Sequence, residues 1–452
     1  VTHHAFGFEN RLRSFKRFSF CVLLLDSQAK PLRSINAMQD NVIIRSRAIL
    51  PIDRPPIFNG ALVMQGDKIL SVDDWTKVRR EFVGTVLDLG EQVMLPGLIN
   101  AHCHLDYTLM AGKLKKPTSF TSWIQSMIKQ KRAWNEKDFQ DSWISGYQKL
   151  IQSGTTLVAD TVSHPSRFDP RNLPRGPRLF PFYELIHLQD TPLDANDLSM
   201  SARHTALFEK TKGDKAGISP HAPYTTSPEL WRSLKRAPTL CNLPFSMHLS
   251  ESIEEYDLFK HRKGPMFEWF NSIKHLPEWG TGSPIQLMDQ AGILKKNGIA
   301  VHVNCLDEGD VERLVQNNMH IVHCPRSHAY FAHPTFQIND LQSKNLNIAL
   351  GTDSLASVTD EDSPESLSLF DEMRKLLEGE NAVKPESILK MSTLNGAKAL
   401  GLQGEAGSLE AGKRADWISL PWNGKKESLA EHAIGSLEPV SSVFLGGKEI
   451  SG

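Results

Sequence analysis

Eight short apolar runs recur between about residues 95 and 403, and stretches compatible with helices separate them, as at 123–131, 228–234 and 363–377. Alternation of this kind places parallel strands in one sheet and covers the sheet with helices. Eight such units in roughly 300 residues predict an α/β fold, a (β/α)₈ barrel of the TIM type, whose active site lies at the carboxyl ends of the strands. The runs are 94–106, 155–160, 178–186, 216–223, 244–249, 298–303, 320–324 and 346–350.

The two ends of the chain differ in character from this middle. Short strand-like runs and tight turns fill 41–94, where Gly66 and Asp67 separate two apolar runs as in a hairpin, and 407–450 has the same style. The 452 residues exceed what one ordinary core needs, whereas a barrel with a small partner accounts for them. We expect residues 38–94 and 404–452 to form one small β-sandwich domain, with the barrel at 95–403.

Residues 1–37 precede the first methionine, Met38, which stands just before a strand-like run. We expect translation to begin at Met38, so that 1–37 is an extension or a disordered leader. The basic residues at 11–17 followed by an apolar run at 18–25 leave an export signal as the alternative. No stretch approaches the roughly 18 to 20 uninterrupted apolar residues that a membrane-spanning helix needs.

The overall charge does not suggest a surface that binds polyanions, because 51 Lys and Arg residues nearly balance 52 Asp and Glu residues. The five cysteines are odd in number, scattered and without a C-x-x-C spacing, so a disulfide framework is not expected. We therefore expect a cytoplasmic protein that acts on a small molecule, without a nucleic-acid or membrane partner.

Metal-ligating residue types gather where the predicted strands end. His102 and His104 close the first run, and because alternate strand residues point the same way, both imidazoles face one side. Such a pair alone is weak evidence for a metal site, since 17 histidines in 452 residues give about 0.6 His-x-His pairs by chance. Further runs end at or carry His221, His248, Glu251, His302 and Asp353. Their joint placement at one end of one barrel predicts a functional site.

These residues sit in motifs at 95–104, 219–225, 248–251, 323–327, 351–353 and 407–416. The chain resembles the amidohydrolase superfamily in these motifs, in the branch of cytosine, guanine and adenosine-type deaminases and triazine hydrolases, over nearly all of 41–452. The resemblance implies four metal ligands, His102, His104, His248 and Asp353. It also implies that Glu251 is a proton shuttle and that His302 is a partner of the metal-bound water.

The implied ligand set suits hydrolysis of a C–N bond. An ion held by three neutral imidazoles and one carboxylate lowers the pKa of bound water from 15.7 towards about 7, so a metal-bound hydroxide is available at neutral pH. Glu251 would take the proton of the water and return it to departing ammonia. Asp353 would also accept a proton from the water, and His302 would orient the water or hold developing charge. We therefore expect three catalytic residues, Glu251, His302 and Asp353.

One divalent ion is expected, because the two-metal relatives use a lysine or glutamate at the end of strand four, where this chain has no lysine within 217–223. Three nitrogens and one oxygen suit zinc, our first choice, and also ferrous iron. Relatives are often dimers, which makes a homodimer a further expectation.

The resemblance also suggests substrate contacts. His221 occupies the place of a substrate-contacting histidine, with a rim histidine locked by prolines as the alternative. His328 stands where asparagine is common, which argues against a plain adenosine or S-adenosylhomocysteine substrate. The motifs at 326–331 and 351–357 together resemble aminodeoxyfutalosine deaminases more closely, and Arg326 would pair with the carboxylate of such a substrate unless it is a surface arginine.

The first hypothesis is a metal-dependent deaminase of an aminopurine nucleoside of the aminodeoxyfutalosine, S-adenosylhomocysteine or adenosine type. The alternatives are hydrolysis of another C–N or C–Cl bond on a heteroaromatic ring and a metal-free, non-catalytic scaffold of the same shape.

Overall fold

The computed structural model describes residues 40–164, 170–189, 191–193, 195–273, 282–359, 365–379, 383–424 and 429–450. The predicted leader at 1–37 lies outside these residues. The fold described is that of the unit Asp40–Gly452.

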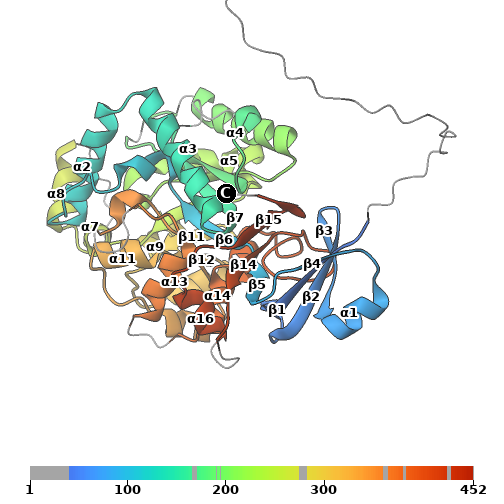
Figure 1. Cartoon of the computed structure of the whole chain (residues 1–452). Coiled ribbons are helices and arrows are strands. Elements are labelled where there is room, and N and C mark those ends of the chain that lie inside the picture. The colour runs from blue at the N-terminus through green and yellow to red at the C-terminus, as the bar shows by residue number, and fades with distance from the viewer. Residues whose placement is uncertain are drawn as a thin grey trace, which may run out of the picture. The chain divides into compact units, whose positions relative to one another are not determined.

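Eight parallel strands form a closed ring with helices around it, which confirms the predicted barrel (Figure 1). The ring consists of two four-stranded sheets, and parallel bridges join them at both seams, between Cys103 and Asp353 and between Ile218 and Phe245. The strands are β6 (Leu98–Cys103), β7 (Thr155–Val162), β8 (Arg178–Leu185), β9 (Gly217–Pro220), β10 (Ser246–Leu249), β11 (Ile299–His302), β12 (His320–His323) and β13 (Asn347–Leu350).

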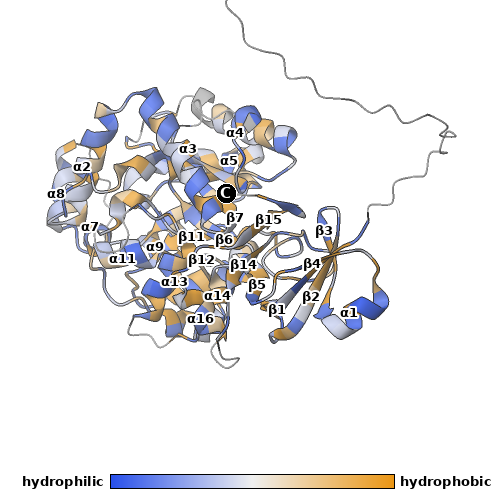
Figure 2. Ribbon diagram, viewed as in Figure 1, coloured by the Kyte–Doolittle hydropathy of each residue, from blue (hydrophilic) through white to orange (hydrophobic). Residues whose placement is uncertain are grey.

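The helices cover the outside of the ring and carry both hydrophilic and hydrophobic residues, as expected when one face of a helix packs on the strands (Figure 2). Those that follow barrel strands are α2 (Phe120–Ala133), α3 (Glu136–Gln152), α4 (Ala195–Lys212), α5 (Pro228–Arg236), α6 (Pro238–Cys241), α7 (Ile253–Lys260), α8 (Gly264–Ile273), α9 (Pro284–Gln290), α10 (Asp310–Gln316), α11 (Pro325–Tyr330), α12 (Ile338–Ser343), α13 (Leu369–Leu377), α14 (Pro385–Met391) and α15 (Leu394–Ala399). In the described part of the chain, no helix is long and apolar enough to cross a bilayer.

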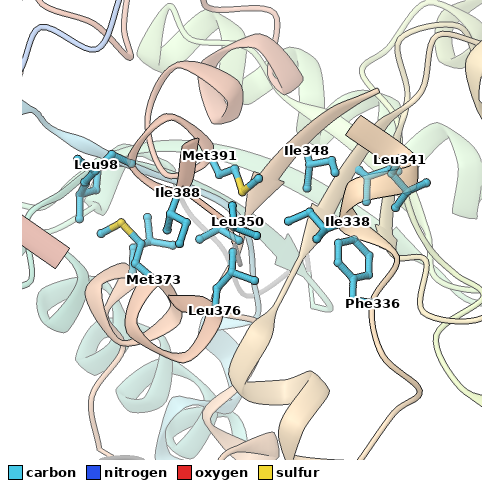
Figure 3. Close-up of a cluster of buried hydrophobic side chains, with 14 of the residues drawn as sticks. Leu98, Phe336, Ile338, Leu341, Ile348, Leu350, Met373, Leu376, Ile388 and Met391 are labelled. Carbon is cyan, nitrogen blue, oxygen red and sulfur yellow. The ribbon is translucent and has the colours of Figure 1, made fainter. Parts of the chain in front are cut away.

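Strand β13 illustrates how the barrel core is divided. Leu350 lies beside Ile388 of α14 and Leu376 of α13, and Ile348 lies beside Met391 of α14 and Ile338 of α12, all in one buried cluster outside the ring (Figure 3). Ala349, between these two strand residues, belongs to a second buried cluster that includes residues of β6, β7, β8, β11 and β12. Because successive strand residues face opposite sides, the large side chains of β13 bind the helices while its alanine fills the narrow interior. The strands are thus buried on both faces and read as continuous apolar runs.

The small β unit is one eight-stranded sheet to which both ends of the chain contribute. Its two parts join where β5 and β14 pair antiparallel, from Trp417 opposite Pro96 to Pro421 opposite Gln92. The strands are β1 (Val42–Ile49), β2 (Ile57–Gln65), β3 (Lys68–Asp74), β4 (Thr85–Asp88), β5 (Gln92–Pro96), β14 (Trp417–Pro421), β15 (Ser442–Leu445) and β16 (Lys448–Glu449). Helix α1 (Trp75–Glu81) packs on β2 and β3, whereas α16 (Leu429–Gly435), between β14 and β15 in the chain, packs on the barrel helices α13 and α14. The predicted hairpin at Gly66 is the connection between β2 and β3. The predicted boundaries at 38–94, 95–403 and 404–452 stay predictions.

Candidate metal centre

Four histidines and an aspartate meet at the carboxyl ends of the barrel strands. His102 lies in β6 and His104 directly after it, and His248 and His302 lie in β10 and β11. Asp353 follows β13 by three residues. Parallel strands end on the same side of a barrel, so these side chains converge although up to about 250 residues separate them in the chain. All five are buried.

The distances bring the predicted ligands together. One ligand atom each of His102, His248, His302 and Asp353 lies within 4.8 Å of all the others. His104 joins this group, because its Nε2 atom lies 3.1 Å from Nε2 of His248 and 3.7 Å from Oδ1 of Asp353. The predicted ligands and His302 therefore form one cluster.

The donor atoms of this cluster fit a divalent ion. Nδ1 of His248 faces the backbone oxygen of His221 at 2.9 Å and must carry the proton there, which leaves a lone pair on Nε2. Burial, together with His102 and His221, lowers the pKa of His248 to about 3, so the ring is neutral. Nε2 of His102 and Nε2 of His302 are buried without a hydrogen-bond partner among the described residues. Unpaired imidazole nitrogens beside a carboxylate are the ligands that zinc and ferrous iron accept.

The backbone is held in uncommon conformations around the cluster. His302 and Asp353 have φ values of 75° and 51°, and Ser250 beside Glu251 has a φ of 55°. Residues other than glycine rarely adopt positive φ, and each such residue costs of order 1–3 kcal/mol. Three such residues occur at these strand ends. The fold therefore accepts unfavourable backbone conformations here, and these conformations orient the side chains of the cluster.

Hydrogen bonds across the seam between β6 and β13 fix two of the ligands. The backbone N–H groups of Thr352 and Asp353 donate to the backbone oxygen of His102 at 3.0 and 3.2 Å. A Cβ atom at Gly351 would lie 2.7 Å from that same oxygen, so only glycine permits this approach. The Gly-Thr-Asp motif is thus the structural means by which His102 and Asp353 stay adjacent.

Glu251 lies beside the cluster, at the end of β10. Its Oε1 atom is 3.5 Å from Nε2 of His302. Burial is the main reason that the pKa of Glu251 is raised well above its usual value, and the charges of Asp353 and Glu255 add to the shift. The carboxylate of Glu255 accepts the backbone N–H of Glu251 at 2.7 Å and so fixes the backbone from which Glu251 projects.

His221 is the one predicted substrate contact that the structure brings to the cluster. Its ring centroid lies 4.8 Å from that of His248, and its side chain is 23% exposed. Nδ1 lies 2.7 Å from Oγ1 of Thr225, whereas Nε2 lies 3.9 Å from a carboxylate oxygen of Glu184. One edge of the imidazole is therefore anchored and the other faces Glu184.

The contacts of Arg326 and His328 described below are with residues outside the cluster. Arg326 is 1% exposed, its guanidinium donates to the backbone oxygen of Ser366 at 2.7 Å, and Asp371 is 3.7 Å away. Nε2 of His328 lies 2.8 Å from the backbone oxygen of Pro334. The substrate roles predicted for both residues stay predictions, and these contacts weigh against them.

Three residues near the cluster were missed at the level of sequence. Glu184 is the second-last residue of β8, and its side chain is 5% exposed. Tyr107 stacks on His104 with 5.7 Å between ring centroids, and its hydroxyl accepts a hydrogen bond from Lys131 of α2 at 2.6 Å. Glu184 carries the same signal as the predicted residues, a charged side chain at a strand end. Nothing in the local pattern distinguishes Lys131 from other helical lysines.

Helix α2 is attached to the loops of the metal centre. The carboxylate of Glu254 accepts the backbone N–H groups of Phe120 and Thr121 at 2.8 and 3.0 Å. Nε1 of Trp123 donates to the backbone oxygen of Ala356 at 3.2 Å. The helix is thus fixed at Glu254, three residues after Glu251, and at Ala356, three residues after Asp353.

The sequence pattern of the amidohydrolase family matches residues 93–450, which include the whole cluster. The chain belongs to the amidohydrolase family. Members of this family share the barrel described above, and the predicted family resemblance is confirmed.

This amidohydrolase is similar to named deaminases. A 5-methylthioadenosine/S-adenosylhomocysteine deaminase of Moorella thermoacetica is 28% identical over 424 residues, which cover 90% of this chain and 93% of the relative. An adenosine deaminase of Xanthomonas campestris, solved with bound zinc, has a TM-score of 0.73 at 22% identity and covers 90% of this chain and 92% of its own. The aminofutalosine deaminase of Helicobacter pylori, in complex with methylthio-coformycin, has a TM-score of 0.75 at 21% identity, with coverages of 90% and 100%.

Proposed function

We propose that this amidohydrolase is a hydrolytic deaminase that uses one divalent ion to release ammonia from an adenosine-type nucleoside. The observation that carries the proposal is the buried group of His102, His248, His302 and Asp353, with His104 beside it and Glu251 3.5 Å from His302. The similarity to a 5-methylthioadenosine/S-adenosylhomocysteine deaminase over 90% of the chain supports the substrate class.

The proposed ligands are His102, His104, His248 and Asp353, with zinc as the first choice and ferrous iron as the second. When bound, the ion would supply a Lewis acid that makes water nucleophilic near neutral pH. His302 stays outside the ligand set in this proposal. Its Nε2 atom would instead donate a hydrogen bond that orients the attacking water.

Glu251 is the proposed proton carrier. It would accept a proton from water as the water oxygen bonds to the ring carbon, and it would return the proton to the amine as the C–N bond breaks. A carboxyl whose pKa is raised by burial can hold that proton between the two steps. Asp353 would accept a hydrogen bond from the same water and keep its hydrogen turned away from the ring carbon.

His221 and Glu184 are the proposed substrate contacts beside the ion. Burial, followed by the charge of Lys131, lowers the pKa of His221 to about 3, so its imidazole is neutral and can donate or accept one hydrogen bond. The carboxylate of Glu184, which lies 3.9 Å from the imidazole, would accept hydrogen bonds from hydroxyl groups of the substrate. Arg326 and His328 would remain outside this contact set.

A panel that measures ammonia release tests the proposal. The compounds are adenosine, 5-methylthioadenosine, S-adenosylhomocysteine, aminodeoxyfutalosine, guanine and cytosine, each with zinc-loaded and with chelator-treated protein. We expect turnover of at least one adenosine derivative that depends on the metal. Release of chloride or of an alkylamine from triazines, with no release from the nucleosides, would favour the alternative of another C–N or C–Cl bond. A folded protein that binds no metal would favour the non-catalytic scaffold.

The location and assembly of the protein complete the proposal. We place it in the cytoplasm, and the four cysteines in the described residues, which are all free thiols, support a reducing compartment. A homodimer is the assembly expected from the family, and light scattering of the purified protein tests it.

A further inference from the structure

A cavity of about 540 Å³ opens at the amino-terminal end of the barrel, the end opposite to the metal centre. Its wall is formed by residues just before β9, β10 and β11, by the first residue of β12 and by the end of α15. Cavities of this volume are typical of small-molecule sites. The candidate metal ligands lie at the carboxyl ends of the strands, so this cavity is separate from the metal centre.

The charge of the cavity wall has one sign. Four lysines line it, Lys215, Lys295, Lys296 and Lys398, and the lining contains no aspartate, glutamate or arginine. The whole chain is nearly neutral, with 51 basic and 52 acidic residues, so the excess of positive charge is confined to the neighbourhood of the cavity. Concave surfaces with like charges focus the electrostatic potential and raise the local concentration of ions of opposite charge.

The four lysines have no acidic partners among the described residues. None of the four forms an ion pair with a residue in the described parts of the chain. Nζ of Lys295 donates to the backbone oxygens of Leu240 and Cys241 at 2.9 and 2.8 Å, which are neutral acceptors. The positive charge around the cavity is therefore available for a ligand.

A buried polar group in the wall is also left without a partner. His320, the first residue of β12, lines the cavity and is 5% exposed. Its Nδ1 atom is buried and has no hydrogen-bond partner among the described residues. Buried polar atoms are normally satisfied, so an orphaned nitrogen beside a charged cavity points to a ligand with hydrogen-bonding groups.

We propose that this cavity binds a small phosphorylated metabolite with two or more negative charges. Lys215, Lys296 and Lys398 would surround the phosphate oxygens from three different segments, and His320 would form a hydrogen bond to the ligand. Ammonium groups act as point charges and suit phosphate, whereas a planar carboxylate is read best by arginine, which the wall lacks. The site is independent of the metal centre and of the deaminase proposal.

Isothermal titration of the full-length, metal-loaded protein with a charge series tests the proposal. The probes are fructose, fructose 6-phosphate and fructose 1,6-bisphosphate, which differ in phosphate number on one sugar. We expect no binding of fructose and tighter binding with each added phosphate, with an affinity that falls as salt rises. Equal affinity for the three sugars, or no heat with the bisphosphate at millimolar concentration, would overturn the proposal.

A pair of double variants assigns the effect to the cavity. Lys296→Gln with Lys398→Gln should weaken bisphosphate binding by about tenfold or more. Lys129→Gln with Lys390→Gln changes the net charge equally at two exposed lysines outside the cavity and should leave the affinity unchanged. Equal weakening by both pairs would show that only overall charge matters and would refute the site.

A measurement on the unchanged protein covers the case in which the cavity variant does not fold. Acetylation of lysines, followed by mass spectrometry, should show that fructose 1,6-bisphosphate protects Lys215, Lys296 and Lys398 but not Lys129 or Lys390. Absence of selective protection at saturating bisphosphate would contradict the proposal, whatever the variants do.

Discussion

The Nε2 atoms of His104 and His248 lie 3.1 Å apart, although His104 directly follows β6 and His248 lies in β10, in the other four-stranded half of the barrel. Nδ1 of His248 is committed as a donor to the backbone oxygen of His221, so the lone pair of Nε2 points at its neighbour. A divalent ion held by His104 and His248 would satisfy both nitrogens at once. This relationship connects the fold to the proposed chemistry, because only closure of the barrel brings the two strands together.

The ligand set can be tested by contrasting two buried histidines. His248→Ala should lower the metal affinity by more than the roughly 10- to 100-fold that loss of an outer partner costs, because it removes a proposed ligand. His302→Ala should retain the metal and lose turnover. Metal analysis of both variants after dialysis measures the difference. If His302→Ala empties the site while His104→Ala keeps the ion, His302 replaces His104 as a ligand.

Glu251→Gln should lower kcat by about 10²- to 10⁴-fold, because the amide keeps the shape of the side chain but cannot carry the proton. The metal content should stay unchanged, since Glu251 is outside the proposed ligand set. Glu378→Gln, an exposed position, is the matched control and should retain full activity. Steady-state kinetics with metal analysis of the same samples decides the matter. An unaltered kcat in Glu251→Gln would refute the role of proton carrier.

Barrel topology explains why the metal centre could be predicted from the sequence. Once eight β/α units are recognised, every residue at the end of a strand is known to lie at one mouth of the barrel, so His102, His248 and Asp353 could be placed in one functional site without coordinates. Their assignment as metal ligands came from the family resemblance. The positive φ of His302 could not be predicted, because it depends on how the loop after β11 packs.

Barrel topology does not predict which helical residues reach the metal centre, nor contacts between residues far apart in the sequence. Lys131 reaches Tyr107 because α2 is fixed by Glu254 and Ala356, and neither contact has a local sequence pattern. The substrate role predicted for Arg326 rested on the residues next to it in the sequence. Its contact Asp371 follows 45 residues later, a separation at which no periodic pattern operates.

Glu184→Gln should raise KM by about tenfold or more with little change in kcat, because a hydrogen bond to a charged group contributes about 1.5–3 kcal/mol. The side chain is 5% exposed and its carboxylate lies 3.9 Å from Nε2 of His221, where it would accept hydrogen bonds from hydroxyl groups of the substrate. Glu209→Gln on the exposed face of α4 serves as the control. Michaelis kinetics on the best substrate of the panel measures the effect, and a selective loss of kcat would assign Glu184 to the chemical step instead.

Gly351→Ala should lower both stability and metal affinity. The added Cβ would meet the backbone oxygen of His102 at 2.7 Å and its Cβ at 2.9 Å. Overpacking of a rigid core typically costs about 1–3 kcal/mol, and here it would also push His102 away from Asp353. Gly404→Ala, where no atom lies within 4 Å of the added Cβ, is the matched control. Urea unfolding and metal titration of both variants provide the test, and identical behaviour of the two would contradict the tight seam.

Arg326→Met separates a structural role from the substrate role predicted for Arg326. The buried guanidinium donates to the backbone oxygen of Ser366 and lies 3.7 Å from Asp371, so its loss should lower the free energy of unfolding by about 1–3 kcal/mol through unsatisfied polar groups. KM should stay unchanged for substrates with and without a carboxylate, because the side chain is 1% exposed and lies against Asp371 of α13. Urea unfolding and kinetics with S-adenosylhomocysteine and adenosine measure the two effects. A rise in KM confined to the carboxylate-bearing substrate, at unchanged stability, would instead place Arg326 in the substrate site and require the loop at 365–368 to move.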